Sequence, residues 1–311
     1  MKGLELSEKY YQEFGAPMLE TQFPELLPHL ALGLAGPGSE VLGYDDEASQ
    51  DHDFEPGFCI FLPGENLVSR REAFLLERAY AALPKEFLGF RREKLGPAGG
   101  NRHGVLRLSD FLLERIGKPE PALSVREWLT IPEQYFLEIT AGKVYRDDSG
   151  FFARTRETLR FFPEKIAKKK LAGNLLYAAQ CGQYNYERCL VHGENAAAQT
   201  ALFSFTEAAM HCFFLLSERY MPYYKWRFRA FSELPGYARL HSSFEFLLTS
   251  GNTETEAEEK KQIVGEILRE IGRDCGFPEE TDPGKAAYLL NDEIADEEIR
   301  NLHILTAVQE R

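Results

Sequence analysis

The sequence of 311 residues lacks any apolar run close to the ~20 residues that a membrane-spanning helix requires. Its richest stretch, residues 208–216, is short and includes His211 and Cys212. The N-terminal residues are charged and amphipathic, without the apolar core or the small-residue cleavage site of a signal peptide. We therefore expect a cytoplasmic protein with no membrane partner.

Cysteine is scarce in the chain. The five cysteines are odd in number and widely spread, and none of them forms a CxxC pair. This pattern argues against a disulfide framework and against a zinc knuckle, and it predicts reduced thiols.

Positive charge is in deficit, with 36 Lys and Arg against 49 Asp and Glu and a net charge of -13. Nucleic-acid binding depends on clustered Lys and Arg that neutralise phosphates. The basic runs here are short, so we expect no nucleic-acid partner and a small polar ligand instead.

Two common nucleotide-binding motifs are also missing, since the chain has no GxxxxGK[ST] loop and no GxGxxG that follows a strand. Hydrophobic residues make up 44% of the chain and charged residues 27%, which is typical of a globular protein. The length predicts two domains.

The first half of the chain has the pattern of a mixed α/β domain, which we place at residues 1–148. Short apolar runs predict strands at residues 30–35 and 58–62, and weaker ones at 41–44, 86–92, 104–108 and 141–147. Helical spacing predicts a helix between residues 65 and 83 that ends before Pro84. A second helix is expected to run to Ile116 with Ser109 or Asp110 as its cap.

From residue 149 onward the pattern is helical, and we place an all-α domain at 149–311. Apolar stripes with a 3.6-residue period predict helices at residues 151–162, 163–180, 195–220 and 254–272. Gly182 and Pro222 are read as markers of helix ends.

One motif in the first half has chemical meaning. Gly38 and Ser39 follow the first strand in a tight Gly-Pro-Gly-Ser turn, where backbone N–H groups and a hydroxyl can bind phosphate oxygens. Eleven residues later come Asp51 and Asp53, with His52 between them. On a strand these two carboxylates project to the same side, and their repulsion is relieved by a divalent cation with hard oxygen ligands, such as Mg²⁺. We interpret His52 as a packed residue on the opposite face.

These residues resemble the signature of the DNA polymerase beta-like nucleotidyltransferase superfamily. The chain is also similar to the uncharacterised bacterial domain-of-unknown-function family 4037, and this likeness covers most of the chain. The segments that carry it are 38–40, 51–59, 142–148, 183–189 and 223–226. Pro37, directly before Gly38, departs from the apolar residue usual there.

The resemblance implies an α+β fold, in which a nucleotidyltransferase-like domain, a small mixed β-sheet with helices on one face, precedes an all-α helical domain. It implies that Ser39 contacts the triphosphate of ATP and that Asp51 and Asp53 hold Mg²⁺. The expected activity is transfer of AMP from ATP to a hydroxyl of a small polar acceptor bound in a cleft between the domains.

The superfamily also uses a third carboxylate, often the base that activates the acceptor. Asp110 is one candidate for it, and Glu93 and Glu138 are the others. If no carboxylate fills this place, nucleotide binding without transfer becomes the better reading.

The helical half offers candidates for the nucleotide and the acceptor. Residues 168–170 are three lysines that are typical of an exposed helix face, although Lys169 could instead reach a triphosphate. Lys225 lies among aromatic residues that could stack on a base while its amine meets phosphate. An amide- and aromatic-lined cleft would suit a hydroxylated ring. Its expected members are Gln183, Tyr184, Asn185, Glu207, Tyr224 and Trp226.

Each of these groups has a plainer structural reading. Residues 183–186 could form a turn after a helix end, and the aromatic residues at 223–226 could pack the core. Glu207 lies in an apolar helix and needs a partner there, for which Arg188 and Lys225 are candidates. At the level of the whole chain, the alternatives are a non-catalytic nucleotide-binding or protein-interaction module, as in a toxin–antitoxin pair, and an enzyme that nucleotidylates a protein.

Overall fold

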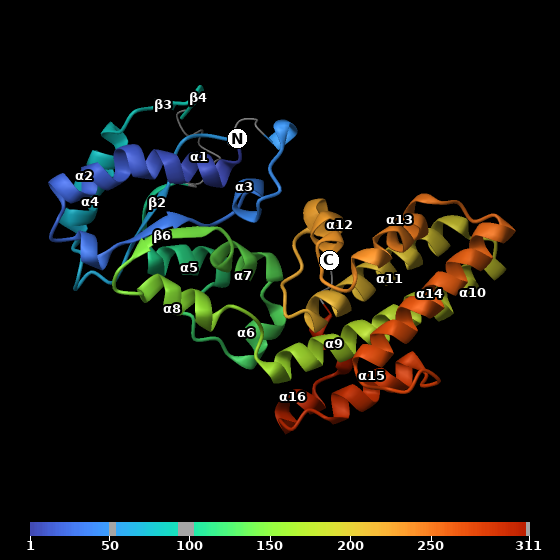
Figure 1. Cartoon of the computed structure of the whole chain (residues 1–311). Helices are drawn as coiled ribbons and strands as arrows, with labels where there is room; N and C mark the ends of the chain where they lie inside the picture. The colour runs from blue at the N-terminus through green and yellow to red at the C-terminus, as the bar shows by residue number, and fades with distance from the viewer. Residues whose placement is uncertain (50–53, 93–102, 309–311) are drawn as a thin grey trace. The chain divides into compact units, whose positions relative to one another are not determined.

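The computed structural model describes residues 1–49, 54–92 and 103–308, and the chain divides into two compact units (Figure 1). The first unit comprises residues 1–122 and 134–160, and the second comprises 123–133 and 161–311. The expected α+β class is confirmed, because the first unit contains a small mixed sheet and the second is built of helices. The pattern of the sequence predicts this boundary between residues 148 and 149.

A four-stranded sheet forms the centre of the first unit, in the order β5-β2-β1-β6. The strands are β1 (Ala31–Leu34), β2 (Cys59–Leu62), β5 (Gly104–Arg107) and β6 (Lys143–Asp147). β1 pairs antiparallel with both β2 and β6, whereas β2 and β5 are parallel. Helix α4 (Arg70–Ala82) connects β2 to β5 and begins at a capping box between Ser69 and Glu72.

Helices cover both faces of this sheet (Figure 1), rather than the one face expected. Ile60 and Leu62 belong to a core with residues of α1 and α4, among them Tyr10 and Leu76. Phe61 points to the opposite face, where its ring stacks on Phe152 with 4.2 Å between centroids. Since strand side chains alternate between faces, coverage on both sides buries all four residues of β2.

The remaining elements of the first unit are short. They are α1 (Gly3–Tyr10), η1 (Tyr11–Gly15), α2 (Ala16–Gln22), η2 (Leu27–His29), α3 (Ser39–Leu42), η3 (Glu47–Ser49), β3 (Glu86–Phe87), β4 (Phe90–Arg91), α5 (Leu108–Ile116), α7 (Glu133–Thr140), whose first residue belongs to the second unit, and α8 (Phe151–Thr158). Two expectations are wrong here. The expected extended segment 41–44 contains no strand, because residues 41 and 42 complete the single turn of α3, which Gly43 closes in the left-handed conformation at φ 75°. α5 begins at Leu108 with Arg107 as its N-cap, so Ser109 and Asp110 lie inside its first turn.

The second unit is a helical assembly around α9 (Glu164–Ala179). α9 packs against α11 and α15, and most of its residues from Ile166 onward are buried. Its other elements are α6 (Val125–Thr130), η4 (Gln180–Asn185), α10 (Tyr186–Val191), α11 (Asn195–Leu216), α12 (Tyr224–Ser232), η5 (Ala238–Leu240), α13 (His241–Thr249), α14 (Glu254–Asp274), α15 (Pro283–Asp292), α16 (Glu297–Asn301) and η6 (Ile304–Ala307).

Gly182 does not end a helix, which corrects the sequence interpretation. The chain continues from α9 through the π-helical segment η4 into α10. A Cβ at Gly182 would lie 2.5 Å from the Phe205 ring, so glycine is required here by the close approach of η4 to α11.

Candidate functional site

The loop after β1 has the backbone that the Gly-Ser motif predicts. Gly36 and Gly38 adopt φ values of 120° and 138°, which side-chain-bearing residues rarely accept. Ser39 follows as the first residue of α3 and is partly exposed. The turn therefore places Ser39 and the backbone of the glycine loop at the end of the buried strand β1.

Strand pairing brings the second half of the motif to the same edge of the sheet. Gly33 pairs with Cys59 in the antiparallel β1–β2 ladder, so the exit from β1 and the entry to β2 are neighbours. Phe54 to Phe58, the segment that leads into β2, follows directly after the Asp-x-Asp motif. Asp51 and Asp53 themselves lie outside the described residues, so their metal site stays a prediction.

The structure locates two of the three candidates for a third carboxylate, Asp110 and Glu138. β5 runs parallel to β2, and Arg107 at its end pairs with Leu62. Asp110 follows this far end, exposed in the first turn of α5, and is therefore not brought to the edge that carries Gly38. Glu93 lies outside the described residues.

Glu138, in contrast, lies beside the glycine loop. Its backbone carbonyl accepts a hydrogen bond from the N–H of Gly36 at 2.9 Å. Its carboxylate forms an ion pair with Arg115, with 3.2 Å between Oε2 and Nε. Burial lowers the pKa of Arg115, and the nearby carboxylates of Glu138 and Glu114 oppose this shift. Glu138 is thus the described candidate that is adjacent to the motif.

Arg115 is a neighbour of the glycine loop that no motif in the sequence indicates. A Cβ at Gly36 would lie 3.3 Å from its guanidinium, so a cation stands next to the glycine loop. Arg115 comes from the last turn of α5, which leads back from the far end of β5. Helical spacing in residues 108–116 was visible in the sequence, but the direction of α5 relative to β1 was not.

His103 and Glu55 form a pair at the entry to β5 that no motif in the sequence indicates. His103 Nδ1 is 3.4 Å from Glu55 Oε1, and both side chains are largely buried. The His103 ring packs against Gly57, where an added Cβ would approach within 2.8 Å. Since β2 and β5 are parallel, their entries share one edge, and this pair lies beside the segment that follows Asp53.

Lys169 is located in the interior of the helical unit, and so is Lys170, which corrects the expectation of an exposed lysine face. The Lys169 amine donates to Asn291 Oδ1 at 2.6 Å and to two backbone carbonyls of residues 300 and 302. Burial lowers the pKa of Lys169. A triphosphate would have to displace these partners to use its charge.

The other helical-unit candidates divide between two segments. Gln183, Tyr184 and Asn185 are exposed in η4, and the Tyr184 hydroxyl accepts a hydrogen bond from Arg188 at 2.8 Å. Tyr224 and Lys225 are exposed on α12, where the Lys225 amine lies 5.0 Å from the ring of the buried Trp226. A role for either group in binding stays a prediction.

Glu207 has a structural partner from α12. Its carboxylate accepts a hydrogen bond from Arg227, which is buried, so the expectation of a partner is met by a residue other than Arg188 or Lys225. This contact joins α11 to α12.

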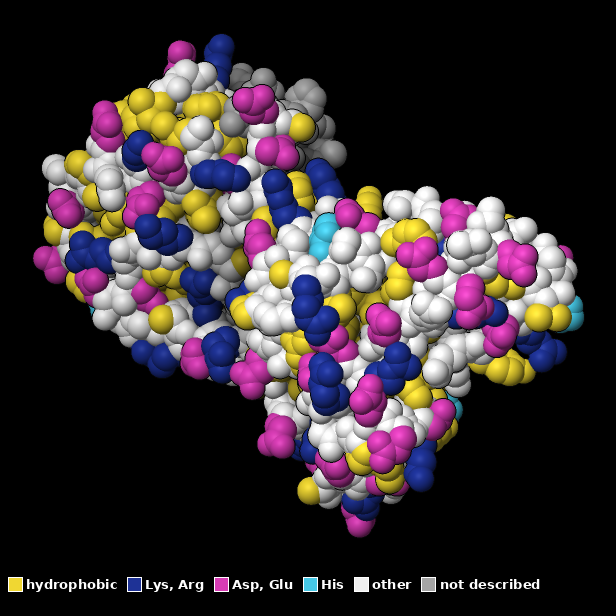
Figure 2. All heavy atoms as spheres, turned by 45° about the vertical axis from the view of Figure 1, so that its right-hand side comes forward, with side chains coloured by type: hydrophobic (Ala, Val, Ile, Leu, Met, Phe, Trp, Pro, Cys, Tyr) yellow, Lys and Arg dark blue, Asp and Glu magenta, His cyan; other side chains and the backbone are white. Residues whose placement is uncertain are grey.

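Charge on the surface is mixed. On the face in Figure 2, Lys and Arg side chains are interspersed with Asp and Glu over both units. Within the described residues, no group of three or more His, Cys, Asp or Glu is arranged to hold a metal ion. All five cysteines are free, and burial raises the pKa of Cys59 to about 12, so its thiol stays protonated.

Comparison with known proteins gives two findings. The sequence profile of the family described as "Domain of unknown function (DUF4037)" matches residues 128–227, which confirms the inferred resemblance for that segment. A crystal structure of a nucleotidyltransferase-like protein from Exiguobacterium sibiricum is similar at a TM-score of 0.38 and 10% identity, covering 89% of this chain and 79% of that chain. A comparison with curated proteins found no match.

Proposed function

We propose that this chain is a nucleotidyltransferase that transfers AMP from ATP to a hydroxyl of a small polar acceptor. The observation that carries the proposal is the β1–β2 pairing, which sets the Gly36–Ser39 loop beside the segment that follows Asp51 and Asp53. A turn whose N–H groups can donate hydrogen bonds to phosphate oxygens, next to paired carboxylates, is the arrangement that metal-dependent nucleotide chemistry requires.

In this proposal Asp51 and Asp53 hold Mg²⁺, which when bound neutralises triphosphate charge and polarises the reacting phosphoryl group. Backbone N–H groups of the glycine loop and the Ser39 hydroxyl orient the phosphates. Arg115, next to Gly36, adds positive charge at the same edge.

The transfer forms a bond between the acceptor oxygen and the α-phosphorus of ATP and breaks the bond from that phosphorus to pyrophosphate. The proton of the acceptor hydroxyl passes to a base at this edge of the sheet. Among the described residues, Glu138 and the His103–Glu55 pair are the candidates for that role. Positioning and charge neutralisation supply most of the catalysis.

Calorimetric titration with MgATP tests the metal and nucleotide assignment. Asp51→Asn and Asp53→Asn are each expected to weaken MgATP binding by about tenfold or more, a loss of about 1.4 kcal/mol. Glu47→Gln removes the same charge from an exposed position in the same region and is expected to bind like the wild type. Unchanged affinity in both aspartate variants would overturn the assignment.

A non-catalytic nucleotide-binding module is the second candidate, favoured by the ion pair that already engages Glu138. Pyrophosphate release from MgATP in the presence of hydroxylated acceptors distinguishes the two. Pyrophosphate release that depends on the acceptor and is lost in Asp53→Asn supports transfer. Tight MgATP binding with no pyrophosphate release, when amino sugars, sugars and polyols are each offered as acceptor, supports the non-catalytic module.

A further inference from the structure

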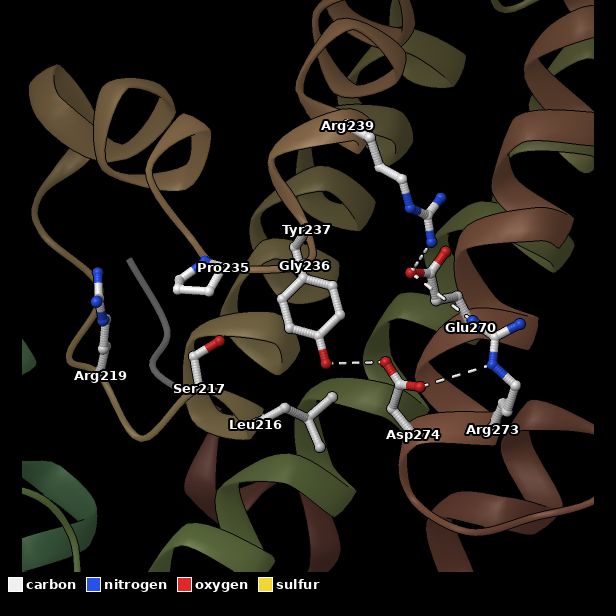
Figure 3. Close-up of a pocket in the computed structure, with 10 residues that line it drawn as sticks. All are labelled: Leu216, Ser217, Arg219, Pro235, Gly236, Tyr237, Arg239, Glu270, Arg273 and Asp274. Carbon is white, nitrogen blue, oxygen red and sulfur yellow. Dashed lines mark hydrogen bonds and ion pairs between the residues drawn. The ribbon is translucent and has the colours of Figure 1, made fainter.

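A pocket of about 530 Å³ opens in the helical unit, and the roles proposed above do not use it (Figure 3). It lies between the end of α11, the turn that precedes η5 and the last turns of α14. All its lining residues belong to the second unit. Its volume is within the range of pockets that bind small molecules.

One wall of the pocket holds two carboxylates that already have partners. Glu270 accepts a hydrogen bond from Arg239 and lies 3.9 Å from Arg273. Asp274 accepts a hydrogen bond from the Tyr237 hydroxyl at 2.8 Å and pairs with Arg273 at 3.6 Å. These contacts, drawn in Figure 3, neutralise the acidic wall internally.

The opposite side of the pocket presents the cation Arg219. In the described part of the chain, the Arg219 guanidinium has no hydrogen bond or ion pair, and neither does the Ser217 hydroxyl. Figure 3 shows Arg219 on the other side of Tyr237 from Asp274. The lining residues include three arginines and two carboxylates, so the pocket has one excess positive charge.

The backbone turn that presents Arg219 is itself unusual. α11 ends at Leu216 with Ser217 as its C-cap, and the next residue, Glu218, has φ 50°, a left-handed position where glycine is the normal residue. The N–H groups of Glu218 and Arg219 bond back to the carbonyls of Leu215 and Phe214 and fix the turn. Arg219 is therefore presented by an ordered turn at the end of a long helix.

Between the charged walls the lining is apolar. Leu216, Pro235 and the Tyr237 ring form this part, and the Tyr237 ring is supported by Phe213 at a centroid distance of 4.5 Å. Burial and the bond to Asp274 raise the pKa of Tyr237, so the phenol stays protonated with its hydrogen already donated. Of the lining side chains that the structure describes, the polar ones without a hydrogen bond or ion pair are thus Ser217 and Arg219, and they lie next to apolar surface.

We infer that this pocket binds a small aromatic oxyanion, a carboxylate or phosphate carried on a ring. The oxyanion accepts hydrogen bonds from the Arg219 guanidinium and the Ser217 hydroxyl, and the ring packs against Pro235 and Tyr237. Guanidinium suits both oxyanions because its planar fork donates two parallel hydrogen bonds. The inference does not depend on the nucleotidyl transfer proposed above.

Calorimetric titration of the full chain with benzoate, phenyl phosphate and uncharged benzyl alcohol tests the inference. We expect saturable binding of at least one anion and much weaker binding of benzyl alcohol. Arg219→Met should weaken the anion about ten- to hundredfold, the usual effect of losing hydrogen bonds to a charged group. Whichever anion binds more tightly identifies the oxyanion.

Arg126→Met is the matched control, because Arg126 is also exposed in the helical unit but does not line the pocket. It removes the same charge and should leave anion binding unchanged. Circular dichroism of both variants verifies that they fold. The inference is overturned if the wild type binds neither anion saturably, or if Arg219→Met binds them as the wild type does.

Discussion

The Glu133 carboxylate lies in the interior of the helical unit with three polar partners. One oxygen contacts His211 Nε2 and lies 3.8 Å from the Lys170 amine, and the other accepts the Met221 N–H at 3.0 Å. Burial alone would raise the pKa of Glu133, but the facing His211 and Lys170 hold it below its ordinary value. A buried group of this kind is costly to break, because removing one charge leaves the others uncompensated.

We expect Glu133→Gln to reduce the free energy of unfolding by about 3–5 kcal/mol, as measured by urea denaturation. Because the folded-state pKa is lowered, the contribution of the carboxylate is present above the ordinary pKa near 4.5 and is lost as the pH falls through the folded value. The variant should lack this part of the acid dependence. Glu194→Gln, at an exposed position, serves as control, and equal losses in the two variants would contradict the assignment.

Lys169 illustrates why single residues are hard to place from the sequence. Three consecutive lysines predict an exposed face, yet Lys169 and Lys170 are both fully buried. Carbonyl oxygens at residues 291, 300 and 302 accept the Lys169 protons, and they come from α15 and α16 and the segment after α16. The partners are more than a hundred residues away, so no local pattern contains them.

At the level of elements, the pairing of β6 with β1 depends on a glycine. Gly142 adopts φ 79°, and a Cβ there would lie 2.0 Å from the Leu34 carbonyl oxygen. The close approach occurs at the end of β1, two residues before Gly36. The register of this edge strand therefore bears directly on the geometry of the glycine loop.

Gly142→Ala should cost about 2 kcal/mol or more in the free energy of unfolding, because it combines left-handed backbone strain with a collision. Gly43→Ala is the matched control, since Gly43 has φ 75° with nothing within 4 Å of the added Cβ. Its loss should be only about 1 kcal/mol, from backbone strain alone. Urea denaturation compares them, and a Gly43→Ala loss as large as that of Gly142→Ala would contradict this account.

At the scale of the whole molecule, charge limits the partners. The net charge is -13, and acidic side chains are interspersed with basic ones on the face in Figure 2. In the described parts of the chain, no helix combines the length and the apolar character that a bilayer span requires.

We expect transfer RNA and single-stranded DNA to show no binding at micromolar protein in mobility-shift titrations at low salt. Low salt is the most permissive condition, because phosphate contacts weaken steeply as salt increases. Tight binding that collapses with added salt would reveal a basic surface strong enough to overcome the net charge, and it would contradict the expected small acceptor.

Local patterns were enough to predict much of the fold. The strands at 31–34 and 59–62 were identified because short apolar runs lie between turn residues, and the long helices at 195–216 and 254–274 because their apolar stripes repeat over many turns. The Gly-Pro-Gly-Ser turn was readable because two of its residues need positive φ, a property visible in residue type.

Tertiary structure alone decided which of these residues meet. Asp110 is close to β5 in the sequence, but the parallel β2–β5 pairing puts it at the far edge, and the direction of α5 returns Arg115 to the glycine loop instead. His103 and Glu55 are 48 residues apart and meet because the entries to two parallel strands share an edge. Residue type and spacing along the chain report local conformation, whereas strand direction and helix packing depend on burial summed over distant segments.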